Sequence, residues 1–96
     1  ARRLAGRGIV VNALHPGVSS TKLLTEGFEM EGSDSLADAA ATSVLLCMDP
    51  ELAAATGGYY VRGRPAPMHA VAGDRELGRR FYELSVAMTG ATALPE

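Results

Sequence analysis

Ile9-Val10-Val11-Asn12-Ala13-Leu14-His15-Pro16-Gly17-Val18-Ser19-Ser20-Thr21 is the stretch of sequence that decides the expected fold. Ile9 to Leu14 is a continuous apolar, β-branched run, which is typical of a parallel strand buried on both faces. The run stops at His15-Pro16-Gly17, because Pro16 cannot donate to a ladder and Gly17 permits a sharp turn. Ligands of open α/β sheets bind beyond the carboxyl ends of the strands, so a binding site is expected at this turn.

The segments that follow predict a helix and then a second strand parallel to the first. Ser35 with Asp38 forms a capping-box-like helix start, and Asp49-Pro50 ends that helix. Tyr59–Val61 then reads as a short strand, which makes a crossover unit with a parallel strand pair. The other expectations are a helix end at Ala1–Ala5, a helical turn at Thr21–Thr25 and a further turn at 51–55, an irregular segment at Arg62–Pro67, a last helix at Arg75–Thr89 with Asp74 as its cap, and a frayed tail at Ala91–Glu96.

Composition excludes several classes of function. The 96 residues carry a formal net charge of −2, which gives no basic footprint for nucleic acid. No apolar run approaches the roughly 18 residues that span a bilayer, and no signal peptide opens the chain. Cys47 is the single cysteine, so neither an internal disulfide nor a metal site is predicted. A soluble cytoplasmic location is the expectation.

The motif around the strand end resembles short-chain dehydrogenases/reductases. In that family a late strand carries Asn, a few residues later Pro-Gly, and then Thr after three intervening residues, a pattern met here by Asn12, Pro16, Gly17 and Thr21. Asp49-Pro50-Glu51-Leu52 followed by 56–61, Thr-Gly-Gly-Tyr-Tyr-Val, resembles the entry to the family's last strand. The ending His-Pro-Gly-Val is similar to that of the retinol-dehydrogenase-like branch. The resemblance covers the chain from Ala1 to about Arg64.

The resemblance implies a fold, an activity and a set of binding residues. The fold class is α/β, and residues 1–96 form a single partial domain, the C-terminal part of a Rossmann-type doubly wound parallel sheet with two parallel strands and flanking helices. The complete protein would transfer a hydride between NAD or NADP and a small-molecule carbonyl or alcohol substrate. The implied cofactor-binding residues are Pro16, Gly17, Val18 and Thr21, beside the nicotinamide, while 28–34 would be part of a lid over the substrate.

The family's catalytic residues have no counterpart in this chain. Its chemistry uses a tyrosine with a lysine four residues later, because the lysine lowers the tyrosine pKa so that the phenol can exchange a proton. The only lysine is Lys22, and none of Tyr59, Tyr60 and Tyr82 has a lysine at that spacing. The glycine-rich pyrophosphate turn is missing as well. No catalytic residue is therefore predicted, and the chain is expected to be inactive alone.

Several polar residues favour a structural interpretation. A buried Asn12 amide must bond to a neighbour, and nothing else in the sequence forms a catalytic constellation with His15. Tyr59 and Tyr60 are expected to pack within the sheet, and Cys47 to act as a small core residue. Without the family resemblance, Ser20 and Thr21 would be interpreted as helix caps only.

Two further interpretations stay open. A small βαβ unit could be a free-standing interaction module without catalytic activity that pairs its exposed sheet edge with another chain, including a second copy of itself. The chain could equally be a decayed gene product without activity. The first residues read as the last turn of a helix, and the first methionine is Met30. Those two features favour the C-terminal portion of a longer protein.

Overall fold

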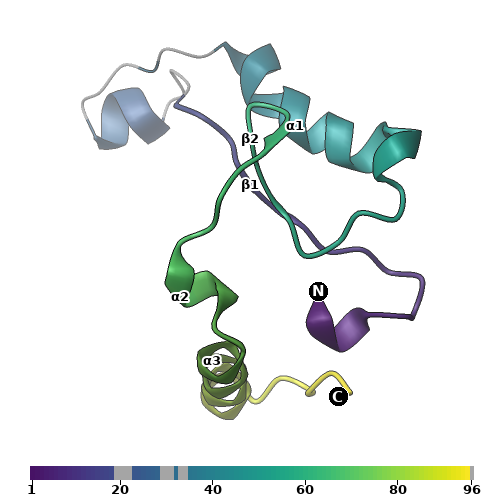
Figure 1. The fold of residues 1–96 in the computed structure, drawn as a ribbon. Coiled ribbons are helices and arrows are strands. Elements are labelled where there is room, and N and C mark those ends of the chain that lie inside the picture. The colour runs from purple at the N-terminus through teal and green to yellow at the C-terminus, as the bar shows by residue number, and fades with distance from the viewer. Residues whose placement is uncertain (19–22, 29–31, 33–34, 96) are drawn as a thin grey trace.

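The computed structural model is a mixed α/β arrangement in which a small sheet lies between helices (Figure 1). It describes residues 1–18, 23–28, 32 and 35–95. In chain order the elements are η1 (Arg2–Leu4), β1 (Ala13–His15), η2 (Leu23–Gly27), α1 (Leu36–Met48), η3 (Pro50–Leu52), β2 (Tyr59–Val61), β3 (Arg64–Pro65), α2 (Ala70–Gly73) and α3 (Arg75–Thr89).

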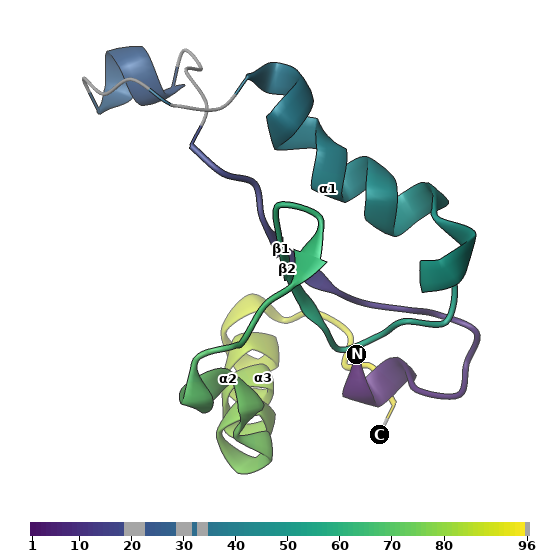
Figure 2. The same ribbon diagram turned by 45° about the horizontal axis from the view of Figure 1, so that its top comes forward.

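The sheet has the order β1-β2-β3 and contains the predicted parallel pair. β1 and β2 are parallel, with Leu14 opposite Tyr60, and α1 lies on the crossover between them. The third strand was not predicted, since Arg62–Pro67 was expected to be irregular. β3 instead turns back antiparallel on β2, with Val61 opposite Arg64. The strands lie between α1 on one side and α2 with α3 on the other (Figure 2).

The prediction for the first strand was wrong in its extent and in its burial. The strand was expected over Ile9–Leu14 but covers only Ala13–His15. Before it, the backbone N–H of Val11 donates to the Thr56 hydroxyl rather than to a backbone carbonyl, so the regular ladder begins later. Ile9, Val10 and Val11 are 50%, 41% and 39% exposed, because the described residues supply too few neighbours to cover them. Tyr60 is the only large apolar side chain buried in the described part of the chain.

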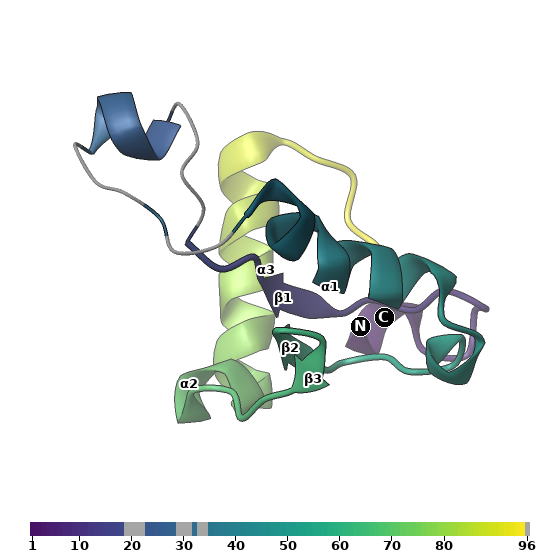
Figure 3. The ribbon, with the colours of Figure 1, turned by 90° about the horizontal axis from the view of Figure 1, so that it is seen from above.

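α1 begins and ends where local sequence signals predicted. The Ser35 hydroxyl accepts the N–H of Asp38 at 3.1 Å, and the Asp38 carboxylate accepts the N–H of Ser35 at 3.2 Å, which completes the capping box. Asp49 accepts the N–H of Glu51 and caps η3, which begins at Pro50. The predicted turn after the helix is therefore present as η3. In Figure 3, α1 lies over the strands, so one face of this helix is turned toward the sheet.

α3 has the predicted bounds. The tail after it was expected to be frayed, but Leu94 is anchored by hydrogen bonds. Asp74 accepts the N–H of Leu77 at the start of α3, and Gly90 ends it in the left-handed region at φ 68°. The N–H of Leu94 donates to the Tyr82 hydroxyl at 2.6 Å, and the carbonyl of Leu94 accepts from the Arg3 guanidinium. The Arg3 guanidinium also stacks 4.0 Å over the Tyr82 ring. These contacts tie the tail to the N-terminal turn, so both termini lie on one side of the molecule (Figure 1).

The remaining helix predictions are met in part. The N-terminal helix end is the short 3₁₀ turn η1. The helical turn expected at Thr21–Thr25 overlaps a wide helical turn, η2, at Leu23–Gly27, while residues 21 and 22 lie outside the described residues. Much of the 28–34 segment, the expected lid, lies outside the described residues. No helix in the described ranges combines the length and the apolar character needed to cross a membrane.

Candidate functional site

The His15-Pro16-Gly17 turn leaves the carboxyl end of β1 as the sequence predicted. Gly17 has φ 83°, in the left-handed region that glycine adopts without a steric penalty. Its N–H donates to His15 Nδ1 at 2.9 Å, and this bond closes the turn. His15 therefore has a structural role here. Gly17 itself is half-buried, so its backbone lies against the rest of the site.

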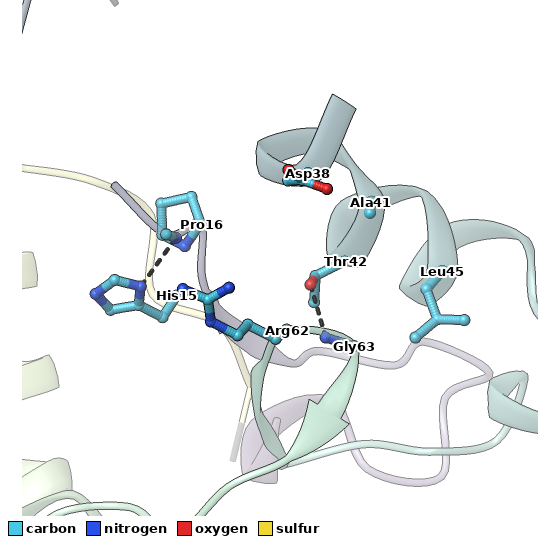
Figure 4. Close-up of a pocket in the computed structure, with 9 residues that line it drawn as sticks. His15, Pro16, Asp38, Ala41, Thr42, Leu45, Arg62 and Gly63 are labelled. Carbon is cyan, nitrogen blue, oxygen red and sulfur yellow. Dashed lines mark hydrogen bonds between the residues drawn. The ribbon is translucent and has the colours of Figure 1, made fainter. Parts of the chain in front are cut away.

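A pocket of about 330 Å³ joins this turn to α1 and to the turn between β2 and β3. In Figure 4, Arg62 extends from that turn toward His15 and Pro16, while Thr42 and Leu45 project from α1. Its lining residues are His15, Pro16, Gly17, Asp38, Ala41, Thr42, Leu45, Arg62 and Gly63. A volume of this size is at the lower end of those that hold small ligands.

Thr42 fixes the second wall of the pocket. It is 3% exposed, and its hydroxyl accepts the N–H of Gly63 at 2.9 Å. Arg62 and Gly63 have φ values of 51° and 75°, and two consecutive left-handed residues between paired strands make a type I′ turn. The bond from Thr42 therefore holds this turn against α1. Sequence reasoning missed the turn, although Arg-Gly between Val61 and Arg64 was the available signal.

The pocket carries one carboxylate and one guanidinium. Hydrogen bonds from the hydroxyl and then the backbone N–H of Ser35 lower the pKa of Asp38, and the positive charge of Arg62 lowers it further. Asp38 is therefore ionised at neutral pH and serves its helix cap, which excludes it as a general acid. In the described residues, no cluster of three or more His, Cys, Asp or Glu is placed to hold a metal ion.

Asn12 joins the two parallel strands through its side chain. Its amide nitrogen donates to the carbonyl of Ala55 at 2.8 Å, and its amide oxygen accepts the N–H of Gly58 at 2.9 Å. The structural interpretation of Asn12 is thus confirmed. The bond to Gly58 also sets where the chain enters β2.

Asn12→Leu is expected to destabilise the chain by about 1–3 kcal/mol, because two hydrogen bonds worth about 0.5–1.5 kcal/mol each are lost. Urea denaturation followed by circular dichroism measures the change. Asn12→Asp is the comparison variant. Its carboxylate can still accept the N–H of Gly58, but it cannot donate to the carbonyl of Ala55. An Asn12→Leu variant as stable as the wild type would contradict the bridging role.

Thr42→Val is expected to cost about 1–3 kcal/mol, because a near-isosteric swap leaves the Gly63 N–H without its acceptor in a part-buried position. The type I′ turn should loosen, which amide hydrogen exchange at Gly63 reports directly. Thr42→Ser retains the hydroxyl and should keep the protection. Equal exchange rates at Gly63 in both variants would show that Thr42 does not hold the turn.

The structure brings some of the predicted cofactor-binding residues together. Pro16 and Gly17 line the pocket, whereas Val18 does not and is 43% exposed. Thr21 lies outside the described residues, as does Lys22. Tyr60 is 6% exposed and packs within the sheet as expected, while Cys47, predicted to lie in the core, is exposed on α1. That prediction failed because α1 covers the sheet with only one of its faces.

Comparison with known proteins relates the chain to short-chain dehydrogenases/reductases of the retinol dehydrogenase type. It is 35% identical to human retinol dehydrogenase 13 over 97% of its own length and 28% identical to human retinol dehydrogenase 14 over 94%. The mouse retinol dehydrogenase 14 is 26% identical over 94%. No family model and no solved structure matches.

The matches confirm the resemblance to short-chain dehydrogenases/reductases of the retinol dehydrogenase type. Over nearly its whole length the chain is homologous to retinol dehydrogenases, and it spans only 30–32% of the length of these relatives. That proportion agrees with the expected C-terminal portion of a short-chain dehydrogenase/reductase.

Proposed function

We propose that this chain is the C-terminal portion of an NAD(P)-dependent short-chain dehydrogenase/reductase that acts on a small alcohol or carbonyl compound. The observation that carries the proposal is the half-buried Gly17, at φ 83° directly beyond β1, in a chain homologous to retinol dehydrogenases. The names of the relatives specify retinol for those proteins. For this chain the proposal names only the broader class of alcohol and carbonyl substrates.

The Pro16-Gly17 turn fits the nicotinamide end of such a cofactor. A glycine at this φ has no side chain to block a ring that lies against its backbone, and Pro16 offers an apolar surface beside it. When bound, NAD(P) supplies or accepts the hydride. The backbone of Val18 would then bind the carboxamide, the hydroxyl of Thr21 would bind the carboxamide or the pyrophosphate, and 28–34 would form part of the substrate lid.

The residues of this chain position the cofactor but do not move the proton. Proton exchange with the substrate oxygen needs an acid or base within about 2.6–3.2 Å of it. Asp38 serves its helix cap, and His15 Nδ1 accepts from Gly17. The proposal therefore assigns proton transfer to a tyrosine and lysine in a preceding portion of the complete enzyme.

A second candidate function is the free-standing interaction module. The observation in its favour is that β1 stands at the edge of the sheet, preceded by the exposed Ile9, Val10 and Val11. A module of this kind would bind a partner whether or not a nucleotide is present. Cofactor titration separates the two functions.

Thr21→Val in the complete enzyme is expected to weaken cofactor binding a few-fold to tenfold, because one hydrogen bond worth about 0.5–1.5 kcal/mol is lost. Calorimetric titration with NADH and NADPH measures the effect. Thr89→Val, at the end of α3, is the control and should leave the affinity unchanged. Unchanged affinity in Thr21→Val would restrict Thr21 to capping a helix.

A further inference from the structure

The pocket beyond β1 lies where both parallel strands end. The register sets His15 opposite Val61, so the residues that follow them, Pro16 and Arg62, leave the sheet at the same edge. Arg62 extends from its turn toward His15 and Pro16 (Figure 4). The lining residues come from this turn, from α1 and from the end of β1, on the side of β1 that pairs with β2. A strand preceding this portion would pair with the opposite edge of β1, so these walls do not depend on it.

Arg62 occupies a backbone position that does not favour arginine. Its φ is 51°, and within the described ranges no other residue except glycine has a positive φ. The first central position of a type I′ turn favours asparagine, aspartate or glycine, which reach the left-handed conformation at least cost. The local conformation therefore does not explain an arginine here. Residues held in unfavourable conformations cluster at binding and catalytic sites, which points to a role for the side chain.

The neighbours of Arg62 in the pocket define what its guanidinium can bind. Asp38 lines the pocket as well, and its carboxylate accepts hydrogen bonds from the backbone N–H and the hydroxyl of Ser35. This carboxylate is therefore engaged at the start of α1, although its charge still interacts with that of Arg62. Ala41 and Leu45 add apolar surface from the same helix. A guanidinium binds a carboxylate through two parallel hydrogen bonds, so the pocket suits a molecule with an apolar chain and a carboxylate end.

We propose that Arg62 binds a carboxylate of the substrate, so that the preferred substrates are acidic alcohols and acidic carbonyl compounds. This inference rests on the proposed function, in which the nicotinamide lies against Gly17. The substrate carbon that exchanges the hydride must meet that ring, so the rest of the substrate lies near Pro16 and Arg62. The phosphates of NAD(P) are the other anions available, but a ribose separates them from the nicotinamide. The substrate is therefore the source of the anionic group.

Steady-state kinetics of the complete enzyme with matched substrates tests this role. The substrates are ω-oxo carboxylates of increasing chain length and their methyl esters, which share the aldehyde and differ in charge. Arg62→Asn should lower kcat/KM for the acids at least about tenfold, because hydrogen bonds to a charged group are lost, and should affect the esters far less. Arg64→Gln is the control. It removes the neighbouring arginine on β3, which is not among the residues that line the pocket, and should leave the preference for acids unchanged.

The choice of asparagine separates binding from folding. Asparagine suits the type I′ turn better than arginine does, so Arg62→Asn should unfold at a higher temperature than the wild type while it loses the preference for acids.

The outcomes distinguish this inference from the proposed function. An equal ratio of acid to ester activity in wild type and Arg62→Asn would overturn the role of Arg62, while turnover of the esters would still support the proposed function. Weaker binding of NADH and NADPH by Arg62→Asn, with the acid-to-ester ratio unchanged, would place a cofactor phosphate on Arg62 and overturn the substrate class. Absence of turnover with every substrate in the wild type would contradict the proposed function and this inference with it.

Discussion

The 96 residues, purified alone, are expected to transfer no hydride between NAD(P) and any alcohol or carbonyl substrate. The chemical reason is the missing proton donor. The Tyr60 ring is buried in the sheet, and the Tyr82 hydroxyl accepts from Leu94, so neither presents its phenol beside the Pro16-Gly17 turn. Tyr59 has no lysine four residues later. A lysine on the same helix face is what lets a tyrosine exchange a proton in this kind of chemistry, and none of the three tyrosines has a lysine at that spacing.

Nicotinamide absorbance, followed with a panel of aldehydes, ketones and alcohols, measures this prediction. The positive control is a complete retinol dehydrogenase assayed with the same panel. Turnover by the isolated chain would contradict the assignment of proton transfer to a preceding portion. Binding of the cofactor without turnover would agree with it, because the turn positions the nicotinamide only.

Gly17→Val in the complete enzyme is expected to lower cofactor affinity by more than the roughly tenfold ceiling for Thr21→Val. Two effects add. A left-handed backbone costs an ordinary residue about 1–2 kcal/mol, and a β-branched side chain suffers most. The new side chain would also occupy the half-buried position against which the nicotinamide is proposed to lie.

A second glycine with a similar backbone conformation separates the effect of backbone strain from the effect of blocking the site. Gly6 has φ 74° and has open space around its missing side chain, so Gly6→Val carries the same backbone strain away from the pocket. Both variants should lose stability in urea, but only Gly17→Val should lose cofactor affinity in a calorimetric titration. An equal loss of affinity in both variants would show that the turn has no direct contact with the cofactor.

Local sequence signals predicted α1, α3 and the parallel pairing of the strands, whereas α2 at Ala70–Gly73 was not predicted and the first strand is shorter than expected. The capping box at Ser35 and the caps at Asp74 and Gly90 act within one helical turn, so their effect is readable from a few neighbouring residues. The turn at Pro16-Gly17 was predictable for the same reason. The roles of Asn12 and Tyr60 followed from the type of residue and its place in a strand.

Features that depend on distant residues were not predictable. The burial of Ile9–Val11 depends on which layers cover the strand, and the described residues leave it exposed. The bond from Thr42 to Gly63 joins residues 21 positions apart, and the contact from Arg3 to Leu94 spans 91 positions. The pocket depends on the parallel register of β1 and β2, which sets Val61 opposite His15 and so brings Arg62 near Pro16.

The most direct measurement of the central claim is the reading of the gene in frame upstream of the Ala1 codon. The account predicts a coding region about twice the length of this chain, because the relatives are about three times as long as the segment they share with it. Within that region a Tyr-x-x-x-Lys should be encoded shortly before Arg2, and a glycine-rich turn much further upstream. A start codon with a ribosome-binding site directly before Ala1 would contradict the account and favour a free-standing module.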